Sequence, residues 1–206
     1  LLTQLGRERS AGQHYPEIVI YSLDLTAQHA RERAGDTVGY VAALVAAVQA
    51  LARAGADFAL IAANTPHRHF DAIAAQSPLP LISIVEETAR AAGQRGYRSV
   101  GLLGTKITMR SDFYPQAFAR AGIRLVAPEK DDDLDYIDAK IMAELVNMQL
   151  VEKTRQRLVA IARNLAAQHK LEAVILGCTE LPLILSSENL GPVSYTHLRA
   201  HETVLD

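Results

Sequence analysis

Short, nearly continuous apolar runs alternate with longer stretches of helical period along this chain, and this alternation limits the possible folds more than any other feature. Strands with such runs are typical of a parallel sheet that helices cover on both faces. The pattern therefore predicts an α/β fold with right-handed crossovers. The predicted strands are Ile18–Ser22, Phe58–Ala62, Leu81–Val85, Val100–Gly104, Arg124–Ala127 and Ala173–Gly177.

Three long stretches between these runs are predicted to be helices. After Asp36, apolar residues from Val38 to Ala52 recur at spacings of three and four, and Gly55 ends the stretch. Residues 132–148 and 152–169 form a second and a third helix before the last predicted strand. Parallel sheets bind ligands at the carboxyl ends of their strands, so the residues that directly follow strands are the candidates for a site.

Charge and composition argue against several classes of function. The 21 Lys and Arg residues nearly balance the 23 Asp and Glu residues, and no basic run is present, which argues against nucleic-acid binding. No apolar run approaches the ~20 residues of a membrane-spanning helix. The single cysteine, Cys178, excludes an internal disulfide and favours a reducing cytoplasm. The histidines at positions 67, 69 and 169 lack metal-ligand spacing, so no metal site is expected, and ATP and nicotinamide motifs are absent.

Two predicted strand ends resemble each other. Residues 56–65 and 171–180 each pass from a helix end through a buried strand into a turn of small polar residues. Superposing the two segments puts Ala63 opposite Cys178. One interpretation is that any two β-α units of one sheet look alike. The other is an internal duplication of two lobes whose turns face a shared cleft.

Cys178 directly follows the last predicted strand. As a buried small hydrophobe it would be structural. At the mouth of a parallel sheet, its sulfur would instead point into a cleft, where backbone N–H groups would lower its pKa below the usual ~8.5. A thiolate there can act as a nucleophile or as a base. Thr179 and Glu180 either cap the next helix or bind the carboxylate and the ammonium of a substrate.

Small polar residues also follow two other predicted strands. Asn64 and Thr65 belong to an Asn-Thr-Pro turn, and the adjacent His67 is more often structural than catalytic. Thr105 and Thr108 follow the strand that ends at Gly104, and their hydroxyls and amides suit an anion. These residues are candidate ligand contacts.

The two motifs at residues 63–67 (Ala-Asn-Thr-Pro-His) and 177–180 (Gly-Cys-Thr-Glu) resemble those of the aspartate/glutamate racemase family, the cofactor-independent amino-acid racemases. Residues 84–88 and 101–105 support the resemblance, which extends to Val193. The Cys-Thr-Glu form is similar to that of the aspartate racemase branch.

The resemblance implies two pseudo-symmetric parallel-sheet lobes, with the active site between them, in a homodimer without a pyridoxal cofactor. The lobes would be residues 1–92 and 93–190, followed by a C-terminal segment, 191–206, of which 194–206 is predicted to be a non-native tail. Compared with the family, the chain would be truncated at both ends, lacking the opening strand and the returning segment.

The family mechanism implied by the resemblance uses two facing thiols, one of which removes the α-proton while the other reprotonates the opposite face. Ala63 occupies the position of the first cysteine and has no ionisable atom, so racemisation would be impaired. Cys178 would act alone, with water, Thr65 or His67 as the second proton donor. The substrate contacts implied are Asn64, Thr65, Thr105, Thr108, Thr179 and Glu180.

Three hypotheses remain from the sequence. The first is an amino-acid racemase acting on aspartate or glutamate through thiol-based α-proton abstraction. The second is a one-thiol decarboxylase or isomerase of a dicarboxylic acid. The third is a catalytically silent homologue that binds an amino acid or a dicarboxylate. Ala63 favours the third, whereas the intact motif at 177–180 counts against it.

Overall fold

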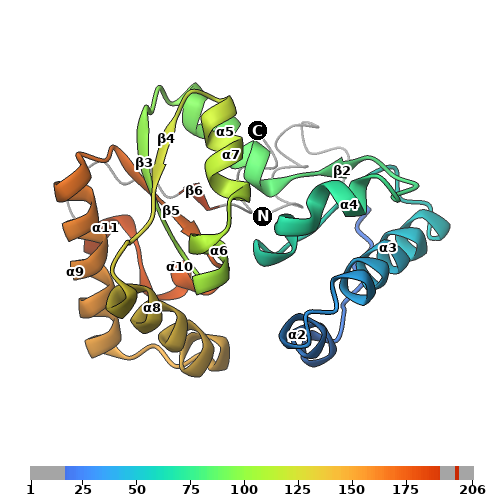
Figure 1. Ribbon diagram of the computed structural model, residues 1–206, viewed down its shortest axis with the longest axis horizontal. Coiled ribbons are helices and arrows are strands. Elements are labelled where there is room, and N and C mark those ends of the chain that lie inside the picture. Colours follow the sequence, from blue (N-terminus) through green and yellow to red (C-terminus); the bar gives the residue numbers. More distant parts are fainter. Residues whose placement is uncertain (1–16, 191–197, 200–206) are drawn as a thin grey trace. The chain divides into compact units, whose positions relative to one another are not determined.

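The computed structural model describes residues 17–190 and 198–199 (Figure 1). The described residues form two compact units, each of which is described by itself. The first unit comprises residues 17–60 and 69–82, and the second comprises 61–68, 83–190 and 198–199. The segment 61–68, which includes most of the 3-10 helix Thr65–His69, thus belongs to the second unit, although it follows a strand of the first. The lobe boundary predicted at residue 92 stays a prediction.

The first unit is mainly helical. Its longest helix begins after Asp36, as predicted, because the Asp36 carboxylate accepts a hydrogen bond from the Gly39 amide at 2.9 Å. It ends before Gly55, which has a φ of +90° that suits glycine. Val38 is 82% exposed, so the buried stripe of this helix begins only at Tyr40. The elements are α2 (Leu25–Arg33), α3 (Thr37–Arg53), β1 (Ala59–Leu60), α4 (Phe70–Ala74) and β2 (Leu81–Ile82), and β1 pairs with β2 in parallel.

Three strand predictions in this part of the chain were wrong in part or in full. Residues 18–22 have no strand structure, because none of the described residues pairs with their backbone. The strand predicted at 58–62 is reduced to β1. The strand predicted at 81–85 ends at Ile82, since the Ser83 hydroxyl accepts from the Glu86 amide at 3.3 Å and starts a helix. The apolar residues at 84 and 85 are therefore helical.

The second unit is built on a parallel sheet in the order β4-β3-β5-β6 (Figure 1). Gly104, at the end of β3, is in register with Gly177, at the end of β5. The strands are β3 (Ser99–Gly104), β4 (Arg124–Val126), β5 (Ala173–Gly177) and β6 (Leu198–Arg199). The helices are α5 (Ile84–Gln94), α6 (Lys106–Arg110), α7 (Phe113–Arg120), α8 (Asp131–Ala143), α9 (Glu152–His169), α10 (Leu181–Ile184) and α11 (Ser187–Leu190).

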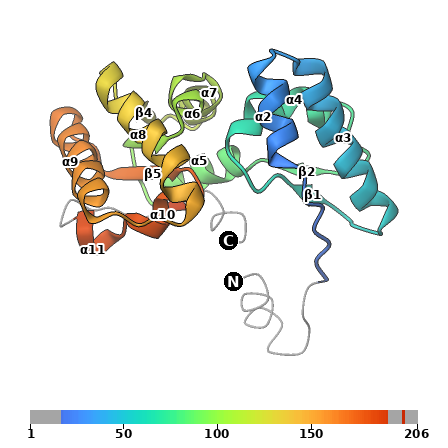
Figure 2. The ribbon, with the colours of Figure 1, turned by 90° about the horizontal axis from the view of Figure 1, so that it is seen from below.

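Helices cover both faces of this sheet, with α9 on one side and α5 and α7 on the other (Figure 2). Alternate residues of each strand enter the two cores, because successive side chains of a strand point to opposite faces. Leu103 and Leu176 pack in the core that includes α8 and α9, whereas Leu102 and Ile175 pack in the core that includes α5 and α7. This arrangement confirms the predicted α/β class with a parallel sheet.

One prediction in the C-terminal half differs from the structure, and another stays untested. The helix predicted over 132–148 ends at Ala143, and a short 3-10 helix, Leu145–Asn147, leads to Met148, whose φ of 58° ends the helical path. Most of the segment 194–206 lies outside the described residues, although its residues 198–199 form β6 beside β5, so the prediction of a non-native tail stays a prediction. Across the described part of the chain, every helix is too short or too polar to cross a membrane.

Candidate active site

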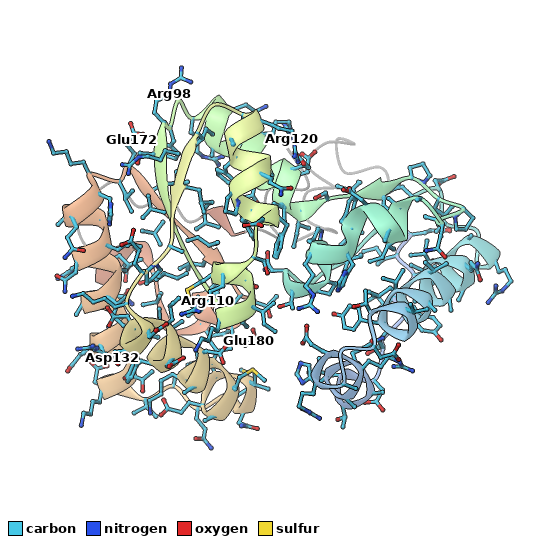
Figure 3. The ribbon with its side chains drawn as sticks, in the orientation of Figure 1. Arg98, Arg110, Arg120, Asp132, Glu172 and Glu180 are labelled. Carbon is cyan, nitrogen blue, oxygen red and sulfur yellow. The ribbon has the colours of Figure 1, made fainter. Side chains whose placement is uncertain are left out.

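The candidate site lies at the carboxyl ends of β3 and β5, entirely within the second unit. Gly104 and Gly177 let these ends approach, since a Cβ on Gly104 would lie 2.9 Å from the Gly177 carbonyl oxygen. The next residues, Thr105 and Cys178, therefore leave the sheet at the same edge. Figure 3 shows Glu180 at this end of the unit, away from the end at which Arg98 and Glu172 lie.

Three threonine hydroxyls form a cluster at this edge. The Oγ1 atoms of Thr105 and Thr108 are 3.0 Å apart, and Thr65 Oγ1 lies 3.4 Å from Thr108 Oγ1 and 3.5 Å from Thr105 Oγ1. The Thr105 hydroxyl also accepts from the Thr108 amide, which fixes its position at the start of α6. Thr65 and Thr105 are half-buried and can turn their hydroxyl hydrogens outward, so they offer two donors to an anion, whereas Thr108 is fully buried behind them. The predicted contacts Thr65, Thr105 and Thr108 are thus brought together.

His67 ties the turn at residues 63–67 to the start of α5. Its Nδ1 lies 2.9 Å from the Ala63 carbonyl oxygen, and the Ile84 amide donates to its Nε2 at 3.3 Å. Nδ1 must therefore carry the hydrogen, and the ring is neutral. Burial is the main cause that lowers the pKa of His67 to about 4, although the hydrogen bonds to backbone oppose it. A neutral ring with both nitrogens engaged has a structural role, and it is a poor second proton donor.

Cys178 is buried but has a polar partner. Its side chain is 7% exposed, and Sγ donates to Glu180 Oε2 at 2.8 Å. The Thr179 hydroxyl donates to the same oxygen at 2.6 Å. The second group of predicted residues, Cys178, Thr179 and Glu180, therefore forms one hydrogen-bonded set.

The expectation of an open sulfur with a lowered pKa was wrong. The pKa of Cys178 is raised to about 12, chiefly by burial and then by its hydrogen bond to the Glu180 carboxylate. The backbone amides of Glu180 and Leu181 lower this pKa, as expected, but burial, the hydrogen bond to Glu180 and the charge of Glu180 together outweigh them. In the free protein, Cys178 is a neutral thiol at physiological pH.

Tyr114, on α7, is a site residue that sequence reasoning missed. Its hydroxyl donates to Asn64 Oδ1 at 2.6 Å, across 50 residues of sequence. Tyr114 is fully buried and Asn64 is 7% exposed. Burial raises the pKa of Tyr114 well above its usual value, so the hydroxyl stays protonated. No sequence signal distinguished Tyr114 from an ordinary aromatic core residue.

The remaining predicted position, Ala63, is exposed and contributes a methyl group and the carbonyl that His67 binds. No ionisable side chain occupies this position. Within residues 17–190 and 198–199, no group of three His, Cys, Asp or Glu side chains is placed to hold a metal ion.

The model of the Asp/Glu/Hydantoin racemase family matches residues 2–192. The chain belongs to this family. Two solved structures are similar to the chain over almost its whole length. A candidate Asp/Glu racemase from Yersinia pestis is 29% identical, with a TM-score of 0.87, and the match covers 99% of this chain and 88% of that one. An aspartate racemase homologue from Pyrococcus horikoshii is 31% identical, with a TM-score of 0.77, over 98% and 89% of the two chains.

Curated relatives in the family include glutamate racemases. That of Thermus thermophilus is 33% identical over 136 residues, which cover 65% of this chain and 47% of the relative. That of Koribacter versatilis is 31% identical over 162 residues, or 74% and 50% of the two chains. The chain thus spans about half the length of these relatives. The predicted family is confirmed, whereas the aspartate branch stays a prediction.

Proposed function

We propose that this member of the Asp/Glu/hydantoin racemase family is a cofactor-independent amino-acid racemase, in which Cys178, after losing its own proton, removes the α-proton of aspartate or glutamate as a thiolate. The observation that carries the proposal is the Cys178–Glu180 hydrogen bond, at the same sheet edge as the three threonine hydroxyls. The site thereby combines a proton-transferring group with donors for a carboxylate and an acceptor for an ammonium group.

Hydrogen-bond donors follow the end of β3 and a carboxylate follows the end of β5, so together they could bind the carboxylate and the ammonium group of an amino acid. The half-buried hydroxyls of Thr65 and Thr105 would donate to a carboxylate, and the buried Thr108 hydroxyl would hold them in place. The Glu180 carboxylate would pair with the α-ammonium. A substrate bound in this way would hold its α-carbon between the hydroxyl cluster and the thiol, so that Cys178 reaches one face of that carbon.

Ionisation of Cys178 is the energetic difficulty of this mechanism. A thiol with a pKa of about 12 costs about 7 kcal/mol to ionise at pH 7, at 1.36 kcal/mol per pKa unit. The negative charge of Glu180 is one cause of that cost. An ammonium group beside Glu180 would neutralise this charge and compete for its oxygens, so substrate binding would itself lower the pKa of the thiol.

Ala63 determines what the proposed enzyme does on the opposite face. A methyl group neither takes nor gives a proton, and His67 is neutral with both ring nitrogens engaged. Water or the Thr65 hydroxyl would then have to supply the second proton. The loss of one acid–base partner typically costs 10²–10⁴-fold, so inversion should be much slower than proton exchange at the Cys178 face.

The same position supports a second candidate function, a catalytically silent binder of amino acids or dicarboxylates. Two observations favour it: the inert side chain of Ala63 and the raised pKa of Cys178. Such a protein would use the hydroxyl cluster and Glu180 for binding only.

Exchange of the α-hydrogen in heavy water tests the proposal. The protein is incubated with L- or D-aspartate and with L- or D-glutamate, and deuterium incorporation is followed by proton NMR. We expect exchange of at least one enantiomer, and its loss in Cys178→Ala. Calorimetric binding of succinate, a dicarboxylate without an ammonium group, shows that the variant still has an intact hydroxyl cluster.

Each result decides between the candidates. Exchange that persists in Cys178→Ala would exclude Cys178 as the base. Binding of amino acids without exchange by the parent protein would identify the silent binder. If the protein neither binds these amino acids nor exchanges their α-hydrogen, both functions are excluded.

A further inference from the structure

The amide group of Asn64 is held in one orientation by a buried tyrosine. Tyr114 O–H donates to Asn64 Oδ1 at 2.6 Å, and the tyrosine ring is packed against Phe113 and Phe118, at centroid distances of 5.3 and 6.1 Å. The hydroxyl is therefore fixed by α7. Asn64 lies directly before Thr65, whose hydroxyl joins the threonine cluster.

A flipped amide would leave the tyrosine without an acceptor. With Nδ2 facing Tyr114, the tyrosine hydrogen would have no other partner among the described residues, at full burial. A buried donor without a partner is costly, so the flipped orientation is disfavoured. The amide thus keeps Oδ1 inward. Its Nδ2–H₂ group has no acceptor in the described part of the chain and remains available to a ligand.

We propose that Tyr114 is a positioning residue, which holds Asn64 so that its Nδ2–H₂ group donates to a substrate carboxylate beside the threonine hydroxyls. This rests on the proposed function for the identity of the ligand. Without Tyr114, the amide can rotate and present its oxygen to the carboxylate, which repels it. Tyr114 would thereby act on substrate affinity through Asn64, without touching the substrate.

Binding of succinate to four proteins separates this role from a merely structural one. The proteins are the parent, Tyr114→Phe, Asn64→Ala and the double variant, and calorimetry gives the dissociation constant of each. We expect either single change to weaken binding about tenfold, the loss of roughly one hydrogen bond to a charged group. In the Asn64→Ala background, Tyr114→Phe should change the constant less than about twofold.

A structural role for Tyr114 would weaken binding equally in both backgrounds, and this result would overturn the proposal. Tyr136→Phe is the matched control, because it removes the hydroxyl of a half-buried tyrosine on α8 of the same unit, whose ring lies beside Lys140 and Arg157. It should bind succinate within about twofold of the parent. Unfolding curves of all variants show whether each one is folded.

Asn64→Asp keeps the proposal testable if Tyr114→Phe does not fold. Aspartate retains an acceptor for Tyr114 but replaces the amide donors with oxygen, so succinate affinity should fall about tenfold or more. Unchanged affinity would overturn the proposal. Succinate has no amino-acid α-centre, so these measurements do not depend on catalysis. A parent that exchanges aspartate but does not bind succinate through Asn64 would refute the role of Tyr114 and leave the proposed function intact.

Discussion

Replacement of His67 by glutamine should remove much of the acid sensitivity of the folded state. The pKa of His67 is about 4 in the folded protein, against 6.5 for an ordinary histidine, so the folded state favours the neutral ring. Stability from this preference is present above pH 6.5 and is lost as the pH falls towards 4. The full effect is about 3.4 kcal/mol at 1.36 kcal/mol per pKa unit, of which about 2 kcal/mol is lost at pH 5.

Urea unfolding followed by circular dichroism at pH 7 and at pH 5 measures this loss. His67→Gln keeps one donor for Ala63 and one acceptor for Ile84 but does not titrate. At an m-value of about 2 kcal/mol/M, the parent midpoint should fall by about 1 M more than that of the variant. His169→Gln, at the end of α9, controls for the loss of a histidine as such. Parallel shifts in the parent and His67→Gln would refute the buried, neutral state of His67.

Three further predictions concern the site. The pKa of Cys178 is raised from 9.0 to about 12, so the neutral thiol stabilises the folded state below pH 9, and this stabilisation is lost between pH 9 and 12. In urea titrations, Cys178→Ala should reduce the fall in the free energy of unfolding over this pH range by at most about 4 kcal/mol. Glu180→Gln removes a charge that raises the thiol pKa, so iodoacetamide should alkylate Cys178 several-fold faster at pH 9, and an unchanged rate would contradict the assigned cause. Thr65→Val removes a half-buried hydroxyl at nearly constant shape and should weaken succinate binding about tenfold in calorimetry, whereas equal binding would exclude the Thr65 hydroxyl as a carboxylate contact.

The parts of the fold that local sequence determines were predicted well. The bounds of α9 and β5 agree with the predicted ranges, because each has a clear period and a distinct end. The strand predicted at 18–22 failed, since strand structure depends on a partner that the local pattern does not reveal. The apolar run at 81–85 also did not show where its strand ends, because the Ser83 hydroxyl caps the start of α5 within that run.

Most members of the candidate site, but not its electrostatics, were predictable from the sequence. Strand ends and small polar turns identified Asn64, Thr105 and Cys178. Whether a cysteine after a strand is open or buried depends on packing by distant elements, and so does the sign of its pKa change. The contact of Tyr114 with Asn64 joins segments 50 residues apart, and nothing in the local pattern indicates it.

The stereochemical course of exchange tests most directly whether a single thiol removes and returns the proton at one face of the α-carbon. Each enantiomer of aspartate is incubated separately in heavy water, and chiral chromatography with mass spectrometry separates deuterium gained with retention from deuterium gained with inversion. The proposed mechanism, with Cys178 as the single base and Ala63 in place of a second one, predicts that one enantiomer gains deuterium with retention at least about 100-fold faster than it inverts. Equal rates of exchange and inversion from both enantiomers would contradict it, because they require a second base opposite the thiol.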